Sequence, residues 1–165
     1  MTGKGPAFGK KPSYTSDVQF RHTLSPDDKT TAILFDNFSV SVLPGGLPFA
    51  TRILSIGFPL VESVSELELA IDVRGAAFLE AGTNATLVFR VLGRTHVLDP
   101  ILGPDDQNPG NYLKSFRLKV PAGSDDLRMT LVIAVEQGPS SRAGQASLTV
   151  DSLDASIGPA DAVEE

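Results

Sequence analysis

The chain of 165 residues contains no cysteine and no tryptophan, and only two histidines and two tyrosines. Without cysteine it can form no disulfide, no thiolate metal site and no cysteine nucleophile. Two histidines provide few bases near neutral pH. The shortage of flat aromatic rings weighs against strong polysaccharide binding, because sugars contact such rings. Stability must therefore come from packing of the aliphatic residues and phenylalanines.

Long apolar runs are also missing. No stretch approaches the roughly 18 apolar residues needed to cross a bilayer, and the first residues lack the apolar core of a secretory signal. The net charge of -6 argues against nucleic acid as a partner, because phosphate binding needs clustered Lys and Arg. It disfavours a membrane surface for the same reason, and we expect no direct membrane insertion.

What the sequence does contain is alternation of apolar and polar residues with a period of two. Residues 67–73 and 127–135 show it most clearly, and Gly, Pro and Asp turns separate about nine such segments. No segment has a helical repeat over ten or more residues. Strands with one apolar face usually pair as two facing sheets. We therefore predict an all-β fold, an antiparallel β-sandwich of jelly-roll type, with a closed barrel as the alternative.

The two ends of the chain differ from this pattern. Residues 1–16 have little to bury and predict a flexible or partner-docked arm, followed by a β-sandwich domain over residues 17–157. Residues 158–165 form an acidic tail. The arm is basic, so the two ends either pair between subunits or are two solvated termini. Inside the domain, residues 75–83 are expected to form a turn or a single helical turn.

The segment from Thr31 to Val42 carries an acid where an apolar residue is expected. A regular strand would place Asp36 in phase with Leu34 and Phe38, and an unpaired buried carboxylate costs several kcal/mol. A β-bulge at residues 35–37 would turn the acid outward and let both Phe35 and Phe38 reach apolar surroundings. The alternative is that Asp36 and Asn37 face a metal or ligand near the sheet edge.

The last strand shows the same irregularity. Val150 is out of phase with Leu153, Ala155 and Ile157, which predicts a second bulge around residues 151–152. If the two irregular strands are neighbours, four polar side chains converge and become the best candidate metal ligands: Asp36, Asn37, Asp151 and Asp154.

The longest irregular segment, residues 99–111, is rich in carboxylate, amide and carbonyl oxygens. Loops of this length are often functional. Calcium takes six to eight oxygens, so it is the one metal ion we consider, although the spacing is not that of an EF-hand, and no other cofactor is expected. The candidate ligand-binding or partner-binding residues here are Asp99, Asp105, Asp106, Asn108, Asn111 and Tyr112.

Catalysis is hard to build from these residues. The acids adjacent in sequence sit on turns, whereas glycoside hydrolysis needs two carboxylates held apart across a cleft. His22 lies on the apolar phase of its strand, as a hydrogen-bonded core or edge histidine does, and His96 is expected to be exposed. We assign no catalytic residue and predict that the protein is not an enzyme.

Four stretches carry a resemblance to a known family: "LSPDDKTTAILFDNFSVSVLPG" (24–45), "LSIGFPL" (54–60), "DVRGAAFLEAGTNATLVF" (72–89) and "ASLTVDSLDASI" (146–157). In order and approximate spacing they resemble the domain-of-unknown-function 4360 family. The resemblance implies a secreted or cell-surface β-rich domain with no assigned activity. This chain differs in having no cysteine and no signal peptide. Residues 112–135 followed by residues 146–157 also look like the closing strands of carbohydrate-binding jelly rolls, a largely architectural similarity.

These observations predict a non-catalytic structural or protein-interaction module. Its partner is another protein or an identical copy, as in a subunit of a larger extracellular or surface assembly. The alternative function is a calcium-assisted carbohydrate-binding domain that uses Tyr112 and the acids of the 99–111 loop.

Overall fold

The computed structural model describes residues 7–9, 13–15, 19–61, 66–91, 94–98, 110–123, 126–138 and 144–159. These ranges contain eleven strands, β1 and β2 being only two and three residues long, and no helix that is long and apolar enough to cross a membrane. The strands are β1 (Ala7–Phe8), β2 (Ser13–Thr15), β3 (Phe20–Leu24), β4 (Thr30–Val42), β5 (Phe49–Val61), β6 (Leu67–Leu79), β7 (Thr83–Val91), β8 (Arg94–Leu98), β9 (Gly110–Val120), β10 (Asp126–Gln137) and β11 (Ala146–Pro159).

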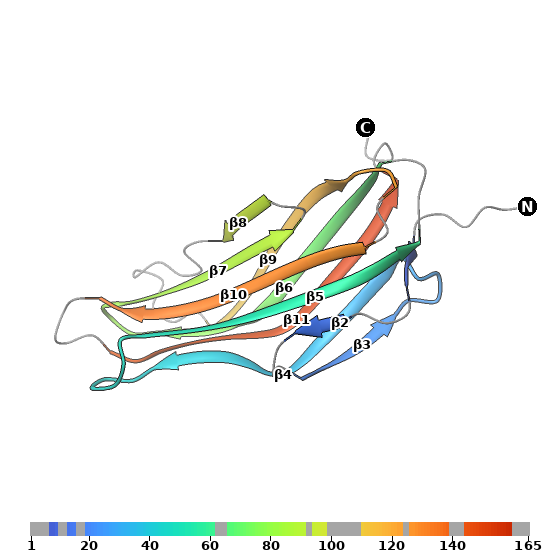
Figure 1. Ribbon diagram of the computed structural model, residues 1–165. Coiled ribbons are helices and arrows are strands. Elements are labelled where there is room, and N and C mark those ends of the chain that lie inside the picture. The colour runs from blue at the N-terminus through green and yellow to red at the C-terminus, as the bar shows by residue number, and fades with distance from the viewer. Residues whose placement is uncertain are drawn as a thin grey trace, which may run out of the picture.

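The strands form two antiparallel sheets that face each other (Figure 1). The first sheet has the order β1-β5-β10-β7-β8, with β2 also paired to β5, and the second has the order β3-β4-β11-β6-β9. The β1–β2, β3–β4 and β7–β8 connections stay within one sheet. Every other connection between consecutive strands carries the chain from one sheet to the other. The predicted jelly-roll-like β-sandwich is confirmed, and the closed barrel is not formed.

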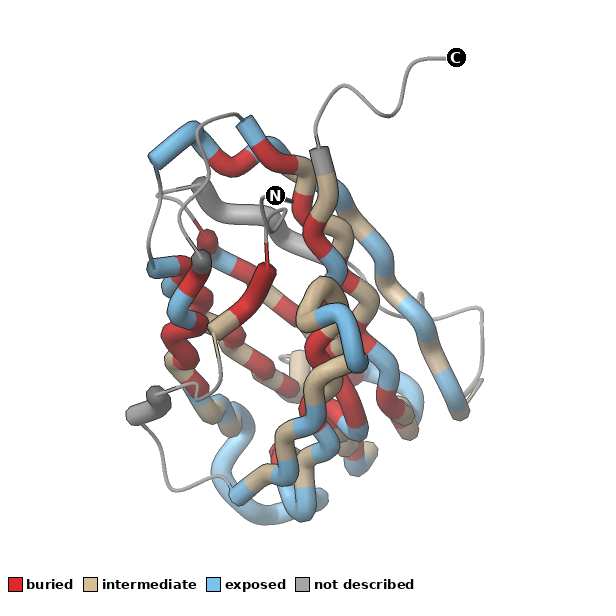
Figure 2. The backbone as a smooth tube through the Cα atoms, turned by 90° about the vertical axis from the view of Figure 1, so that its right-hand side faces the viewer, coloured by how far each residue is buried: buried red, intermediate tan, exposed pale blue. Residues whose placement is uncertain are grey.

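Alternation along the strands builds the core between the sheets (Figure 2). In β6 the residues Leu69, Ile71 and Val73 are fully buried, and they face Leu87 and Ile133 of the first sheet's inner side. Each such side chain contributes about 1.5–3 kcal/mol when it leaves water. The core therefore supplies the packing that a chain without disulfides requires.

Parts of the segments predicted as arm and tail belong to the sheets. β1 and β2 pair with β5, and Phe8 packs against Phe58 with ring centroids 5.7 Å apart. At the other end β11 continues to Pro159. The remaining boundaries of the arm and tail stay predictions.

Both predicted bulges are present, and they oppose each other. β4 and β11 are neighbours, with Val150 paired to Phe38 and Ser152 paired to Leu34. Asp151 alone therefore faces the three residues 35–37 of β4. The backbone N–H of Asp36 is satisfied by the carbonyl of Gln19 at 3.0 Å. A carboxylate that a regular strand would bury is thus exposed.

The β4 bulge changes which side chains face the core. Phe38 is fully buried, and Phe35 packs against it with ring centroids 5.3 Å apart, as predicted. Leu34 was expected to share the buried phase of Phe38, and this expectation is wrong because Leu34 is 46% exposed. Ile33 and Phe38 are both fully buried although they lie five residues apart, an odd step, so the phase reverses between them and Ile33 takes the core position instead.

Arg52 of β5 links the two sheets at this bulge. Its Nη1 donates a hydrogen bond to the carbonyl oxygen of Asn37 at 2.8 Å, and its guanidinium lies 5.9 Å from the centroid of the Phe38 ring. A cation over an aromatic face is attracted by the ring quadrupole. Arg52 therefore holds a carbonyl that the bulge has displaced from the strand ladder.

His22 on the edge strand β3 faces the core, in contact with Phe58 at a ring-centroid distance of 6.5 Å. Its Nε2 is buried and has no hydrogen-bond partner among the residues that the structure describes, which differs from the hydrogen-bonded histidine expected. Burial lowers the pKa of His22 below its ordinary value of 6.5. Desolvation disfavours the protonated imidazole, and the folded protein holds this ring neutral.

This environment predicts an acid-dependent loss of stability. Above pH 6.5 both states hold His22 neutral, so it adds no pH dependence. Below that value the unfolded chain takes up the proton first, and stability falls until the pH passes the lowered pKa of the folded state. Urea unfolding between about pH 7.5 and about pH 5.5 should show a smaller loss for His22→Phe than for the wild type.

Asp27 affects stability in a different pH range from His22. The Ser25 hydroxyl and the backbone N–H of Lys29 lower the pKa of this exposed carboxyl below 3.8, so its contribution is lost only at more acidic pH. If the free energy of unfolding falls equally between about pH 7.5 and about pH 5.5 in the wild type and in His22→Phe, His22 is not the source of the pH dependence.

Candidate functional site

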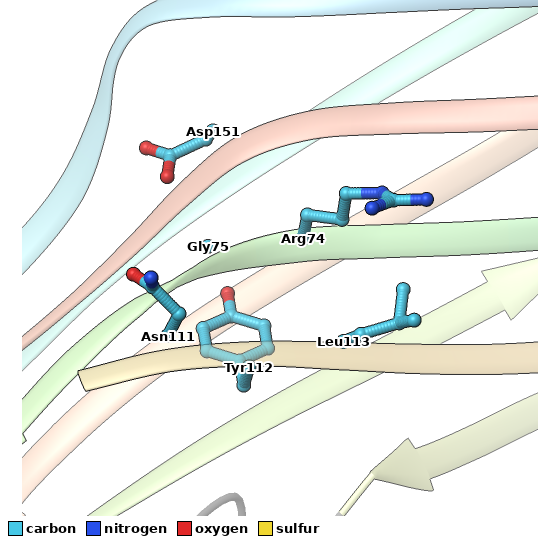
Figure 3. Close-up of a pocket in the computed structure, with 6 residues that line it drawn as sticks. All are labelled: Arg74, Gly75, Asn111, Tyr112, Leu113 and Asp151. Atoms are coloured by element: carbon cyan, nitrogen blue, oxygen red, sulfur yellow. The ribbon is translucent and has the colours of Figure 1, made fainter. Parts of the chain in front are cut away.

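A shallow hollow of about 430 Å³ opens where β11, β6 and β9 lie side by side (Figure 3). Six residues of the described chain line it: Arg74 and Gly75 from β6, Asn111, Tyr112 and Leu113 from β9, and Asp151 from β11. Neighbouring strands hold all six, so their positions are fixed by the sheet and not by a loop.

The hollow exists because two irregularities coincide. Val150 pairs with Gly75 and Ser152 pairs with Arg74, so Asp151 has no partner of its own on β6. Gly75 has no side chain to fill the space, and its partner on β9 is Tyr112. A Cβ at Gly75 would overlap the carbonyl oxygen of Thr149 and lie 2.5 Å from the Tyr112 hydroxyl oxygen. Only glycine lets these backbones and this ring approach so closely.

Tyr112 forms the floor beside Gly75. Its ring packs against the core, and its hydroxyl donates a hydrogen bond to the carbonyl oxygen of Thr149 at 2.8 Å. Burial, and then the negative charge of Asp151, raise the pKa of Tyr112 well above 10.0. The phenol therefore remains a neutral hydrogen-bond donor at any physiological pH.

The rim offers groups of different chemistry. The carboxylate of Asp151 and the amide of Asn111 are exposed, and Leu113 is 52% exposed. Arg74 lies across Gly75 and Tyr112 from Asp151 and Asn111 (Figure 3), and its Nε is 3.7 Å from Oδ2 of Asp154. Ion pairs as exposed as this one contribute little to stability, so the guanidinium can reorient toward a ligand at small cost. Together these groups can accept and donate hydrogen bonds, and Leu113 adds one apolar side chain to the same hollow.

Two residues predicted at or next to the 99–111 loop belong to this site, but both lie in strand β9, which begins at Gly110 inside the segment expected to be irregular. Asn111 and Tyr112 line the hollow together with Asp151, which was predicted from a different strand. The other four residues predicted with them lie outside the described part of the chain: Asp99, Asp105, Asp106 and Asn108.

The predicted metal site is brought together only in part. The β4 and β11 bulges are adjacent. However, the Asp154 carboxylate forms an ion pair with Arg74, and the amide oxygen of Asn37 accepts a hydrogen bond from the Ser39 hydroxyl at 3.1 Å. Over the described ranges, no three His, Cys, Asp or Glu side chains are grouped to hold a metal ion. Asp36, Asp151 and Asp154 therefore do not form a cluster, and metal binding there stays a prediction.

Three lining residues were not predicted from the sequence: Arg74, Gly75 and Leu113. Residues 75–83 were interpreted as a turn, whereas β6 continues to Leu79 and the turn begins after it. A glycine inside an otherwise alternating strand indicates a bulge or a close backbone approach, and that was the available signal.

Fold and hollow together define an antiparallel β-sandwich with a polar depression on the outer side of its second sheet. The chain matches no family model and no curated protein. Membership of the domain-of-unknown-function 4360 family therefore stays a prediction.

Several solved structures are similar to this chain over most of its length at low identity. A structure of infectious bursal disease virus Gt strain has a TM-score of 0.48 at 14% identity, covering 89% of this chain and 35% of the viral chain. The Gx strain structure has a TM-score of 0.45 at 12% identity, covering 91% and 32%. This chain thus spans about a third of those viral chains. A family 35 carbohydrate binding module from an environmental isolate has a TM-score of 0.36 at 14% identity, covering 90% and 97%. At these scores the likeness carries no functional information for this chain.

Proposed function

We propose that the protein is a non-catalytic binding module that holds a small polyhydroxylated ligand, such as one saccharide unit, in the hollow beside Tyr112. The supporting observation is that one hollow brings Arg74, Asn111 and Asp151 together with an exposed leucine, Leu113. A secreted or cell-surface location, which the family resemblance implies, belongs to the same proposal.

The chemistry of the rim suits such a ligand. Vicinal hydroxyls can donate to the Asp151 carboxylate, exchange hydrogen bonds with the Asn111 amide and accept from the Arg74 guanidinium. Leu113 offers an apolar contact to the C–H face of a sugar ring. The volume of about 430 Å³ falls within the roughly 300–1,000 Å³ usual for ligand pockets. The Tyr112 hydroxyl is already bonded to Thr149, so this residue shapes the floor more than it offers a stacking surface.

Binding rather than hydrolysis fits the same residues. The six lining residues include one carboxylate, Asp151, whereas glycoside hydrolysis uses two that flank the scissile bond. Calcium is not part of the proposal, because the acids nearest the hollow are not grouped as ligands in the described chain. Saccharide binding should therefore be the same with calcium and with a chelator.

The experiment is a glycan array with and without calcium, followed by calorimetric titration of the best saccharide. Asn111→Ala and Asp151→Ala should each weaken binding at least about tenfold, since each removes a hydrogen-bonding group worth roughly 1.4 kcal/mol to a polar ligand. Asp36→Ala is the matched control, because Asp36 is an exposed acid of the same sheet that does not line the hollow. Absence of binding in both conditions, or an equal loss in Asp36→Ala, would reject the hollow as the site.

A further inference from the structure

The outer faces of the two sheets differ in character. On the second sheet the outer side chains include many charges, such as Asp72, Arg74 and Arg117. On the first sheet the described residues at the centre of the outer face carry no charge. We call this area the uncharged face, and it consists of Thr51, Ile53 and Ser55 of β5, Thr130, Val132 and Ala134 of β10, and Thr86 and Val88 of β7.

An apolar row crosses the middle of the uncharged face. Ile53 pairs with Val132, and Val132 pairs with Val88, so these three side chains stand side by side on adjacent strands. Ile53 is 55% exposed, and Phe49 further along β5 is 52% exposed. Val88 and Val132 are half-buried, and Thr51 separates Phe49 from the row on the same face. Apolar side chains grouped on an exposed sheet face are suited to contact with another molecule.

Charges of opposite sign mark the two ends of the face. Glu136 lies four residues beyond Val132 on β10, and Arg128 lies four residues before it, with Arg90 of β7 near the same end. The Nε of Arg128 is 2.9 Å from Oδ2 of Asp126, but a guanidinium has further N–H donors for a second carboxylate. The arginines therefore lie on one side of the apolar row and the glutamate lies on the other.

We propose that the uncharged face is the interface of a two-fold symmetric dimer of this chain. If the two-fold axis runs along the apolar row, the row of one copy packs against the same row of the second copy. The strands of the second copy then run in the opposite direction. Val132 then packs on Val132 of the second copy, and Arg128 lies opposite Glu136 of the second copy. A surface whose two ends attract each other under its own symmetry is complementary to itself, as an isologous interface requires.

The dimer leaves the proposed ligand site open. The hollow is formed by β6, β9 and β11 of the second sheet, whereas the dimer uses β5, β7 and β10 of the first. Saccharide affinity should therefore be unchanged in a variant that no longer dimerises, so failure of one proposal is distinguishable from failure of the other.

The first test is sedimentation velocity across a range of protein concentrations. The wild type should shift from monomer to dimer mass, and Ile53→Asp should raise the dissociation constant at least about tenfold, because it buries a charge in the apolar row of the interface. Leu34→Asp is the matched control, since Leu34 is 46% exposed on the other sheet, and it should dimerise like the wild type. Circular dichroism of both variants checks that they fold.

A charge exchange tests the orientation. Glu136→Arg and Arg128→Glu should each weaken the dimer at least about tenfold, because each places like charges opposite each other. The double variant restores opposite charges and should return to within about threefold of the wild type. Monomer mass for the wild type at every concentration would overturn the dimer and leave the face to a different partner. Association that survives Ile53→Asp, or a double variant that does not recover, would overturn it as well.

Discussion

Replacing Gly75 with Ala is expected to lower the free energy of unfolding by about 3 kcal/mol, the upper end of what overpacking usually costs. The added Cβ would overlap the carbonyl oxygen of Thr149 and approach the Tyr112 ring to 2.8 Å. Thr149 belongs to β11, so its backbone cannot withdraw without loosening the pairing of β11 with β6. Urea unfolding of the purified variant measures the effect.

Gly158→Ala is the control for this prediction. Gly158 also lies in β11, its backbone needs no left-handed conformation, and nothing lies within 4 Å of a Cβ placed there. Its unfolding free energy should change by no more than about 0.5 kcal/mol. Similar values for the two variants would contradict the close approach at Gly75.

Phe38→Ala is expected to cost about 3–5 kcal/mol, the usual range for a buried phenylalanine. Phe38 is fully buried, and its removal leaves Phe35 and the Arg52 guanidinium without their common contact. Leu34→Ala should cost less than about 1 kcal/mol, because almost half of that side chain already meets water.

The comparison of Phe38→Ala with Leu34→Ala reports on the bulge itself. A regular β4 would bury both side chains, and the two substitutions would then cost similar amounts. Chemical denaturation of the two variants under one set of conditions distinguishes these cases. Comparable losses would mean that the phase reversal at residues 35–37 is absent.

Much of the fold follows from local alternation. Leu67, Leu69, Ile71 and Val73 predict one dry side, and strands of this kind have few stable arrangements other than a sandwich. Both bulges were also predictable, because Asp36 falls on the apolar phase of Leu34 and Phe38, and because the apolar phase changes between Val150 and Leu153. A buried unpaired carboxylate is costly enough that the backbone must deform around it.

The position of the phase change was harder to predict. The sequence allows Leu34 to belong to the phase of Phe38, and only the pairing of Ser152 with Leu34 places the reversal before Phe38. The alternation of apolar and polar residues does not predict the order of the strands in the sheets either. Arg52 reaches the bulge from the other sheet, and no local pattern indicates that it will do so.

The site was predictable in fragments. Asp151, Asn111 and Tyr112 each stood out for a local reason, but their meeting depends on β6 lying between β9 and β11. Gly75 supplies the space between them and was assigned to a turn, because a short Gly-Ala segment has no alternation of its own. The meeting of these residues is therefore a property of the sheet and not of any one segment.

The candidate site depends on the paired bulges of β4 and β11, because they turn Asp36 outward and leave Asp151 without a partner beside the hollow. Nuclear Overhauser effects between backbone protons across β4 and β11 test them most directly. Contacts of Val150 with Phe38 and of Ser152 with Leu34, with residues 35–37 skipped, are the expected result. A continuous ladder that pairs Asp151 with Asn37 and Ser152 with Asp36 would contradict it.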